Sequence, residues 1–268
     1  MRIRHIKGAE ETVAAHPLVI SEPAQHKGSW KQEMFGNDHP LYLEIGTGMG
    51  TFIRESAVAH PEINYIGLEM NSTVLLKAIQ RYEKKVREEE GTGAETAGEA
   101  GTEAEIKAEA AETEAEAGAE AEVEVEVEKP AYVLRNLRFI DSDARLLEEY
   151  FAPGEVDRIY LNFSDPWPKK KNANKRLTSP MFLERYRKVL AKDARIEFKT
   201  DNRGLFDYSV ETAKEQGWTF HTLTYDLHHD PVLCAGNIMT EYEAKFSAKG
   251  NLIGKMVISR QEQETQEG

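Results

Sequence analysis

The chain has 268 residues and a formal net charge of −13, a length that suits one large domain or two small ones. Its single cysteine, Cys234, excludes an intrachain disulfide and a zinc site of the CxxC type, and it is typical of a reducing compartment. No run approaches about 18 apolar residues, and no apolar stretch follows the charged N-terminus. The sequence therefore predicts no membrane span, no secretory signal and a cytoplasmic protein.

Most of the negative charge lies in one segment. Residues 88–128 hold 16 Glu, one Lys and no Asp, a charge of −15, so subtracting this segment leaves the other 227 residues at +2. An acidic surface repels the phosphates of a nucleic acid. The 227 residues outside the segment are close to neutral, so the net charge of the whole chain does not argue against a nucleic-acid partner. Alanine and glutamate favour helix, whereas like charges four residues apart oppose it. We predict a disordered or partly helical insert at 88–128, either inert or a competitor for a basic loop.

Outside the insert, apolar strands alternate with amphipathic helices, which predicts a mainly parallel sheet with helices on both faces. Segments 218–224 and 241–247 differ, because they alternate apolar and polar residues as antiparallel strands do. We expect one domain over residues 1–268, with an N-terminal arm at 1–35. The parallel strands are expected at 41–45, at 64–68, within 131–140, at 158–163 and at 194–199. The helices are expected at 51–59, after a Ser72 cap, after a Ser179 cap with Pro180 at the first position, and at 205–215.

A glycine-rich turn joins the first strand to the first helix of this pattern. It carries Gly46, Gly48 and Gly50 at alternate positions. Glycines at such a turn let the backbone approach a ligand closely. By itself the loop is equally compatible with a plain tight turn, and it is not the dinucleotide fingerprint GxGxxG.

Acids near the ends of three strands sharpen this interpretation. Glu44 lies just before the glycines, where a carboxylate repels a pyrophosphate and favours an ammonium or sulfonium. Glu69 ends the second strand, the usual place for an acid that accepts ribose hydroxyls, although a solvated strand-end acid is an equal alternative when it is taken alone. Asp143 follows the third strand, where an adenine amino group can be met. Together they predict a positively charged nucleoside ligand, which S-adenosylmethionine fits and NAD fits poorly.

The most distinctive segment leaves the fourth strand and reads Asp165-Pro-Trp-Pro-Lys-Lys-Lys. Open α/β sheets keep their sites at this end of their strands, and prolines on both sides of Trp167 stiffen the turn that carries Asp165. Residues 169–176 hold five positive charges and no acid, which favours contact with RNA or DNA phosphates over a merely solvated loop. Trp167 is equally suited to stacking on a base or to packing within the loop.

Two later segments point the same way, each weakly. Asp201 follows the fifth strand, where it is also placed to cap the next helix. Residues 240–243, Thr-Glu-Tyr-Glu, begin the strand expected at 241–247, where Glu243 is also compatible with a surface position.

Together these segments resemble the bacterial tRNA (guanine-7-)-methyltransferase family, TrmB, over roughly residues 36–253 apart from the insert. The resemblance implies a Rossmann-like class I methyltransferase fold, with a mainly parallel seven-stranded sheet, helices on both faces and an antiparallel C-terminal strand pair. It implies S-adenosylmethionine as cofactor and N7 of a guanosine in the tRNA variable loop, position 46, as the methyl acceptor. This chain carries Asn172 and Asn174 where the family's basic loop usually has His and Lys, and the acidic insert is not a family feature.

The resemblance also implies roles for individual residues. Asp165 is the catalytic candidate. The cofactor side is expected to comprise Glu44, Gly46, Gly48, Gly50, Glu69, Asp143 and Asp165. Substrate contacts are expected from Lys169, Asp201, Thr240, Glu241, Tyr242 and Glu243, and RNA contacts from Lys170, Lys171, Lys175 and Arg176.

Chemistry narrows the role of Asp165. Guanine N7 has a lone pair and no proton, so it needs no base, and a carboxylate serves better as an orienter that also favours the positive charge developing on the purine. Base and orienter both stay open, and Asp201 is the alternative for the essential acid. Competing hypotheses are methyl transfer to an exocyclic amine of a nucleic acid, a non-catalytic tRNA-binding subunit, and a small-molecule methyltransferase. No metal site is predicted, because the run His228-His229-Asp230 has no evident further ligand. Monomer and homodimer are both compatible with the sequence.

Overall fold

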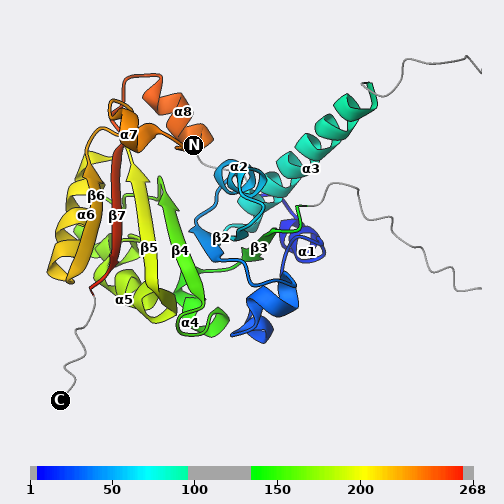
Figure 1. Cartoon of the computed structure of the whole chain (residues 1–268), viewed down its shortest axis with the longest axis horizontal. Helices are drawn as coiled ribbons and strands as arrows, with labels where there is room; N and C mark the ends of the chain where they lie inside the picture. The colour runs from blue at the N-terminus through cyan, green and yellow to red at the C-terminus, as the bar shows by residue number, and fades with distance from the viewer. Residues whose placement is uncertain (1–4, 96–133, 262–268) are drawn as a thin grey trace, which may run out of the picture. The chain divides into compact units, whose positions relative to one another are not determined.

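The computed structural model describes residues 5–95 and 134–261 (Figure 1). The chain divides into two compact units, the first formed by Met1–Tyr82 with Leu134–Gly268 and the second by Glu83–Val133. The second unit contributes the C-terminal part of helix α3. Most of the insert predicted at 88–128 lies outside the described residues; its start, 88–95, continues α3 as helix.

The first unit is built on a seven-stranded sheet in the order β3-β2-β1-β4-β5-β7-β6. Every neighbouring pair from β3 to β5 is parallel, and β7 runs antiparallel to both β5 and β6. The predicted mainly parallel sheet with an antiparallel C-terminal pair is thereby confirmed. The strands are β1 Leu41–Ile45, β2 Asn64–Glu69, β3 Leu137–Asp141, β4 Val156–Asn162, β5 Leu190–Thr200, β6 Trp218–Thr224 and β7 Gly254–Arg260.

The helices follow the strands as the alternation predicts. The α-helices are α1 Ala9–Ala14, α2 Thr51–Ala59, α3 Ser72–Glu95, α4 Leu147–Tyr150, α5 Pro180–Val189, α6 Arg203–Glu215, α7 Pro231–Cys234 and α8 Glu241–Ser247. Shorter turns are η1 Pro23–His26, the π-helical η2 Trp30–Met34, η3 Ala144–Leu146 and η4 Lys170–Lys175. No helix of the described ranges is long and apolar enough to cross a membrane.

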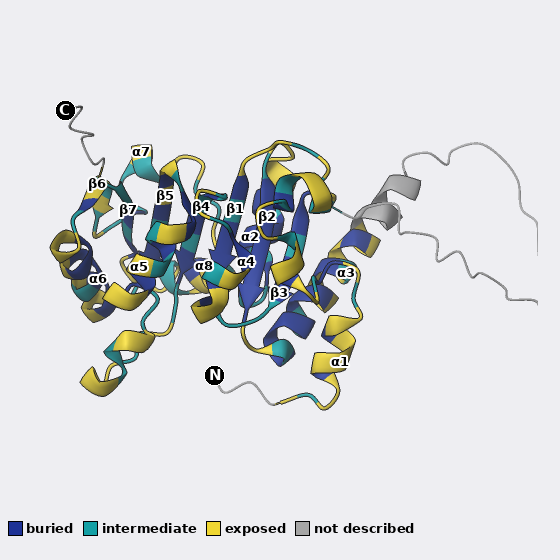
Figure 2. Cartoon of the chain, turned by 90° about the horizontal axis from the view of Figure 1, so that it is seen from below, coloured by how far each residue is buried: buried dark blue, intermediate teal, exposed yellow. Residues whose placement is uncertain are grey.

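Burial explains why the central strands read as continuous apolar runs. All six residues of β2 are buried, because this strand is covered on both faces, whereas β6 at the sheet edge has one buried residue, Trp218, followed by alternating exposed and half-buried positions (Figure 2). The segment expected as an N-terminal arm contributes to the core: Trp30 is completely buried, donates from Nε1 to the carbonyl of Tyr150 at 2.8 Å and stacks on Phe151.

The helix caps differ in part from the prediction. Helix α3 is capped by Asn71 rather than Ser72, since Asn71 Oδ1 accepts the amide of Thr73 at 3.1 Å. Ser179 occupies the cap position of α5, but its hydroxyl donates to the carbonyl of Asn174 instead. In α6 the cap is Asn202, whose Oδ1 accepts the amide of Leu205 at 2.8 Å, so Asp201 is left for another role.

The strand predicted at 241–247 is wrong, since these residues form helix α8. Thr240 caps the helix by accepting the amide of Glu243 at 2.9 Å, the first half of a Thr-x-x-Glu capping box. Tyr242 and Phe246 stack with ring centroids 4.1 Å apart, as residues four apart on a helix do. Apolar residues at these positions satisfy a period of two as well as a helical period, which is why alternation misled. The second antiparallel strand is β7.

Candidate active site

A pocket of about 560 Å³ lies at the carboxyl ends of β1 and β4. Its lining brings together the glycine loop, the first residues of α2, the end of β4 and helix α8. Two segments predicted from opposite ends of the sequence therefore face one space. The lining residues are Glu44, Gly46, Thr47, Gly48, Met49, Gly50, Thr51, Phe52, Asn162, Phe163, Thr240, Glu241, Tyr242, Lys245 and Phe246.

The glycine loop requires glycine for its shape. Gly46, Gly48 and Gly50 have φ values of 75°, 57° and 74°, in the left-handed region that side chains disfavour. At Gly50 space is also short, because a Cβ there would lie 3.0 Å from the Cβ of Ala78. The amide of Gly46 donates to the carbonyl of Leu68 at 2.8 Å, which ties the loop to the end of β2.

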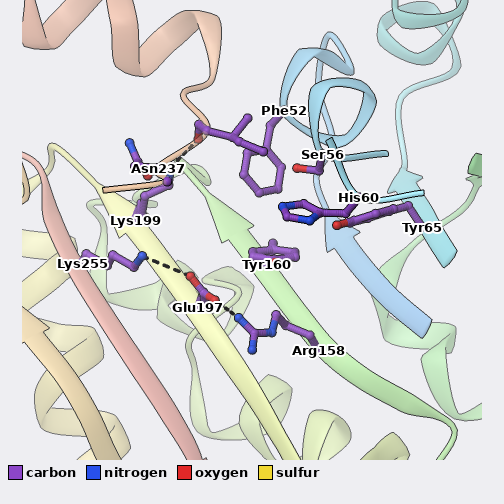
Figure 3. A pocket seen from close by; sticks show the side chains of 12 residues that line it. Phe52, Ser56, His60, Tyr65, Arg158, Tyr160, Glu197, Lys199, Asn237 and Lys255 are labelled. Atoms are coloured by element: carbon purple, nitrogen blue, oxygen red, sulfur yellow. Dashed lines mark hydrogen bonds and ion pairs between the residues drawn. The ribbon is translucent and has the colours of Figure 1, made fainter. Parts of the chain in front are cut away.

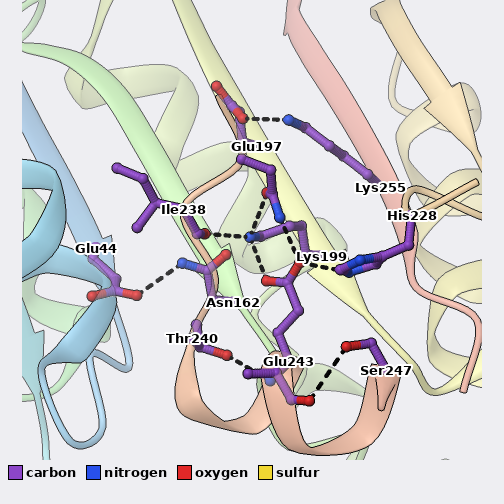
Figure 4. Close-up of polar contacts among 12 residues, drawn as sticks. Glu44, Asn162, Glu197, Lys199, His228, Ile238, Thr240, Glu243, Ser247 and Lys255 are labelled. Carbon is purple, nitrogen blue, oxygen red and sulfur yellow. Dashed lines mark hydrogen bonds and ion pairs between the residues drawn. The ribbon is translucent and has the colours of Figure 1, made fainter. Parts of the chain in front are cut away.

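Glu44 carries its carboxylate into this pocket while remaining only 2% exposed. The Thr47 hydroxyl donates to it at 2.6 Å. The side-chain amide of Asn162 also donates to it, at 2.8 Å (Figure 4). Burial raises the pKa of Glu44 to about 7, and these two hydrogen bonds oppose the rise without cancelling it. A cationic ligand in the pocket would favour the ionised form of this group.

Two more of the predicted cofactor acids lie at the ends of neighbouring strands, Glu69 as the last residue of β2 and Asp143 just after β3. Glu69 accepts the amide of Gly48 at 3.1 Å with one oxygen and that of Asn71 at 3.1 Å with the other, and burial raises its pKa. Asp143 is bound by the side chain of Arg145, with Nη2 and Oδ2 2.7 Å apart, and this hydrogen bond lowers its pKa. Neither acid lines the pocket that contains Glu44.

The Asp165 loop has an unusual backbone. Phe163 and Trp167, at φ 51° and 41°, are the non-glycine residues with positive φ within the described ranges. Asp165 is exposed, and no other described residue holds its carboxylate by a hydrogen bond or ion pair. This group is therefore available to a ligand.

The basic run divides into outward and inward cations. Lys169, Lys170, Lys171 and Lys175 are exposed, and Lys175 Nζ lies 4.7 Å from the ring centre of Trp167. Arg176, predicted as an RNA contact, instead donates from Nε to the carbonyl of Pro166 at 3.0 Å and from Nη2 to that of Trp167 at 3.1 Å. Two of its guanidinium nitrogens therefore bind the protein itself, and the RNA contact expected of Arg176 stays a prediction.

Behind the pocket, Lys199 and Glu243 form a buried ion pair (Figure 4). Lys199 Nζ also donates to Asn237 Oδ1 at 3.0 Å, while Glu243 interacts with His228 Nε2 at 3.1 Å. Desolvation lowers the pKa of Lys199, and the charge of Glu243 opposes this change. Glu243 is 0% exposed, so in this structure it holds α8 in place, and the substrate contact expected of it stays a prediction.

Asp201, also predicted as a substrate contact, is tied to residues beside the pocket. Its Oδ2 accepts a hydrogen bond from the side-chain Nδ2 of Asn251 at 2.9 Å and one from the hydroxyl of Tyr242 at 3.4 Å. Tyr242 itself is 43% exposed and packs against Phe163, with ring centroids 5.1 Å apart, as well as Phe246. The neighbouring Glu241 pairs with Arg81 of α3.

A second, smaller hollow of about 240 Å³ shares Phe52 with the pocket (Figure 3). Its floor carries Glu197, which pairs with Arg158 on one side and with Lys255 at 3.2 Å on the other. The two cations and the one carboxylate leave a net charge of +1, and these ion pairs link β4, β5 and β7. In the described part of the chain, no group of three or more His, Cys, Asp or Glu side chains is arranged to hold a metal ion.

Several residues in the pocket or directly behind it were given no role from the sequence. Asn162, whose side chain donates to Glu44, is the last residue of the apolar strand β4 and lies three residues before Asp165, where a lone amide is a detectable signal. Lys199 is a lysine inside an apolar strand, and a buried lysine calls for a buried acid. Nothing in the local pattern marked Phe163 or Phe246 as pocket-lining aromatics.

Comparison with known proteins identifies the family. Residues 38–256 match the model of a family described as "Putative methyltransferase". A tRNA (guanine-N(7)-)-methyltransferase of Lachnoclostridium phytofermentans is 42% identical over 263 residues, covering 98% of this chain and 100% of that protein. The chain belongs to the tRNA (guanine-N(7)-)-methyltransferase family. Another relative of that name, from Bacillus cytotoxicus, is 41% identical over 254 residues and covers 94% of each chain.

Solved structures show that this family member has the class I methyltransferase fold. An antibiotic-related methyltransferase, 16% identical, superposes with a TM-score of 0.50 over 85% of this chain and 90% of that one. The 16S rRNA methyltransferase KamB, 12% identical, gives a TM-score of 0.51 over 86% and 92%. At such identities the likeness concerns the fold alone.

Proposed function

We propose that this family member transfers the methyl group of S-adenosylmethionine to N7 of the guanosine at position 46 in the variable loop of tRNA. The observation that carries the proposal is the shared pocket, in which the glycine loop and the buried carboxylate of Glu44 face the aromatic side of α8. The exposed Asp165 follows directly from the β4 end that lines this pocket, and exposed lysines follow Asp165.

The residues present suit the cofactor. Glycines at 46, 48 and 50 leave backbone exposed at the pocket wall, and the ionised form of Glu44 complements a sulfonium. We further propose that Glu69 accepts ribose hydroxyls and that Asp143 meets the adenine amino group after releasing its partner Arg145. When bound, the cofactor supplies an electrophilic methyl group. The chain's own task is to bind it, to exclude water and to hold the acceptor nitrogen in line.

The acceptor base is proposed to stack on Tyr242, which Phe163 and Phe246 support. Guanine N7 needs no deprotonation, so Asp165 acts by accepting hydrogen bonds from the edge of the base and by stabilising positive charge on the ring. Lys169, Thr240 and Glu241 complete the substrate contacts. Asp201 acts through Tyr242, to which it is hydrogen-bonded.

The exposed lysines of the basic run provide the grip on RNA. Lys170, Lys171 and Lys175 present point charges that suit phosphates whatever the sequence. Because the target base is stacked in folded tRNA, the enzyme must expose it, at a cost of a few kcal/mol. Binding of the RNA phosphates on both sides of the target base by these lysines offsets that cost.

Incubation with labelled S-adenosylmethionine and unmodified tRNA, followed by nucleoside analysis and mapping of the modified position, tests the function. The expected product is 7-methylguanosine at position 46. Asp165→Asn should lower turnover by roughly 100-fold while the cofactor still binds. If the product carried the methyl group on an exocyclic amine, that amine would be the acceptor and the proposal of N7 would be wrong. Binding of tRNA with no S-adenosylmethionine binding by calorimetry would instead support a non-catalytic subunit.

A further inference from the structure

We infer that Arg176 is a positioning residue for Asp165, held in place by Tyr208 of α6. This inference rests on the proposed function, because it takes Asp165 as the group that meets the acceptor base. It separates Arg176 from the lysines of the basic run, with which the sequence groups it.

The Asp165 loop cannot hold itself. Pro166 and Pro168 have no amide hydrogen to donate, and Trp167 adopts a left-handed φ of 41° that a side chain disfavours. Such a backbone persists only where neighbouring groups hold it. The carbonyls of Pro166 and Trp167, which directly follow Asp165, are the groups that need donors.

Arg176 supplies both donors from one rigid group. Its Nε lies 3.0 Å from the carbonyl oxygen of Pro166 and its Nη2 lies 3.1 Å from that of Trp167. The planar fork of a guanidinium matches two such acceptors, whereas a lysine ammonium does not fix their geometry. Arg176 thereby sets the path of the chain immediately after Asp165.

Tyr208 packs against the guanidinium of Arg176. The guanidinium carbon of Arg176 lies 4.2 Å from the centre of its ring, a stacking contact that desolvation strengthens. Tyr208 stands on α6 between Phe206 and Val210, both buried in the core. On the chain side, the carbonyl of Arg176 accepts the amide of Ser179 at 2.9 Å, next to the start of α5. Through Arg176, the position of the Asp165 loop is thus fixed relative to two helices, α5 and α6.

The lysines of the same run have a different environment. Lys169, Lys170 and Lys171 are exposed, and no hydrogen bond or ion pair to another described residue holds their ammonium groups. Within one basic run the structure therefore assigns RNA contact to the lysines and positioning of the catalytic loop to the arginine.

Arg176→Gln tests the inference with two readouts. We expect kcat at saturating tRNA to fall roughly 10- to 100-fold, because the loop carrying Asp165 is no longer aligned. We expect the log–log salt slope of tRNA affinity to stay as in the wild type. Lys170→Gln removes the same charge from an exposed position and should make that slope shallower by about 0.7–0.9. A slope change of this size in Arg176→Gln, or an unchanged kcat, would overturn the inference.

A matched control distinguishes positioning from general loss of structure. Arg187 makes an equivalent contact elsewhere, donating to the carbonyl of Gln216 at 2.7 Å and lying 4.7 Å from the ring of Trp218. Arg187→Gln should leave kcat unchanged at equal thermal stability. If Arg176→Gln does not fold, Arg176→Lys serves in its place, and it is expected to lose kcat while retaining the charge.

Coupling to Asp165 and Tyr208 completes the test. In an Asp165→Ala background, Arg176→Gln should cause less than about a twofold further loss of kcat, since residues that act as a unit are not additive. Tyr208→Phe should retain turnover and Tyr208→Leu should lose it. Additive losses in the Asp165→Ala background would overturn the inference. Absence of 7-methylguanosine with the wild-type protein would instead defeat the proposed function, and the inference with it.

Discussion

Lys199 and Glu243 form an ion pair that is sealed from solvent: Nζ and Oε2 lie 2.6 Å apart, and the two side chains are 5% and 0% exposed. The pair joins the C-terminal end of strand β5 to the first turn of helix α8. Since α8 forms one wall of the pocket and β5 belongs to the sheet, this contact fixes the width of the site.

Removal of one partner should therefore destabilise the protein strongly. Glu243→Gln leaves the Lys199 ammonium buried without a counter-charge, and we expect the free energy of unfolding to fall by about 3–5 kcal/mol in chemical denaturation. The double variant Lys199→Met with Glu243→Leu should recover most of that loss. The exposed pair Arg203–Asp207, 69% and 50% exposed, is the control, and Asp207→Asn should change stability by less than about 1 kcal/mol. An equal effect of Glu243→Gln and Asp207→Asn would contradict this account.

Cofactor affinity should depend on pH through Glu44. Its pKa is raised to about 7, so below that pH the free protein holds Glu44 largely protonated, and a cation must displace the proton to gain a carboxylate partner. The association constant of S-adenosylmethionine should rise with pH, by up to about tenfold per pH unit below 7, and level off above it. Titration calorimetry in Glu44→Gln should give weaker binding with no such dependence. Glu184→Gln, on the exposed face of α5, should behave as the wild type.

The same group makes an opposite contribution to folding. A raised folded-state pKa means that the folded chain holds the proton more tightly than the unfolded chain does. The stabilisation is complete below pH 4.5 and is lost as pH rises through about 7, a loss on the order of 3 kcal/mol. The difference in unfolding free energy between Glu44→Gln and the wild type should therefore grow in favour of the variant across this range. A constant difference from pH 4.5 to 8 would show that Glu44 titrates normally.

Local patterns predicted the fold better than they predicted the roles of charged residues. The buried run 41–45 and the helix 51–59 match β1 and α2 end to end, because periodicity and glycine punctuation are properties of a short segment. Helix α8 was missed because Tyr242 and Phe246 satisfy two periods, and its capping box was the discriminating feature.

Charged residues depend on partners that the chain supplies from elsewhere. Arg176 turns inward because its guanidinium stacks on Tyr208 of α6 and donates hydrogen bonds to carbonyls of the Asp165 loop. Glu243 can be buried because it forms an ion pair with Lys199 at the end of β5. A run of like charges does not reveal which member turns inward, so the sequence alone groups Arg176 with the exposed lysines.

The glycine loop offers a test of how closely its shape is coupled to ligand binding. Gly50→Ala places a Cβ at a φ of 74° and 3.0 Å from the Cβ of Ala78, with α2 beginning at the next residue. Gly154→Ala meets a similar φ of 80° in open space, with no atom within 4 Å. Both should cost about 1–2 kcal/mol of stability from backbone strain. Only Gly50→Ala should also weaken S-adenosylmethionine binding, measured by calorimetry, and equal affinities in the two variants would remove the loop from the cofactor site.

Tyr242 should matter through its ring more than through its hydroxyl. The hydroxyl makes a long hydrogen bond of 3.4 Å to Asp201, whereas the ring packs between Phe163 and Phe246 and remains 43% exposed toward the pocket. Stacking of a base on an aromatic side chain is worth about 1–3 kcal/mol, so Tyr242→Ala should raise the KM for tRNA by roughly 5- to 150-fold. Tyr242→Phe keeps the ring and should change KM by less than about threefold, since a weak exposed hydrogen bond contributes little. Steady-state kinetics with unmodified tRNA decides between the two groups. Equal losses in both variants would move recognition to the hydroxyl and to Asp201, and Asp201→Asn would then be expected to reproduce them.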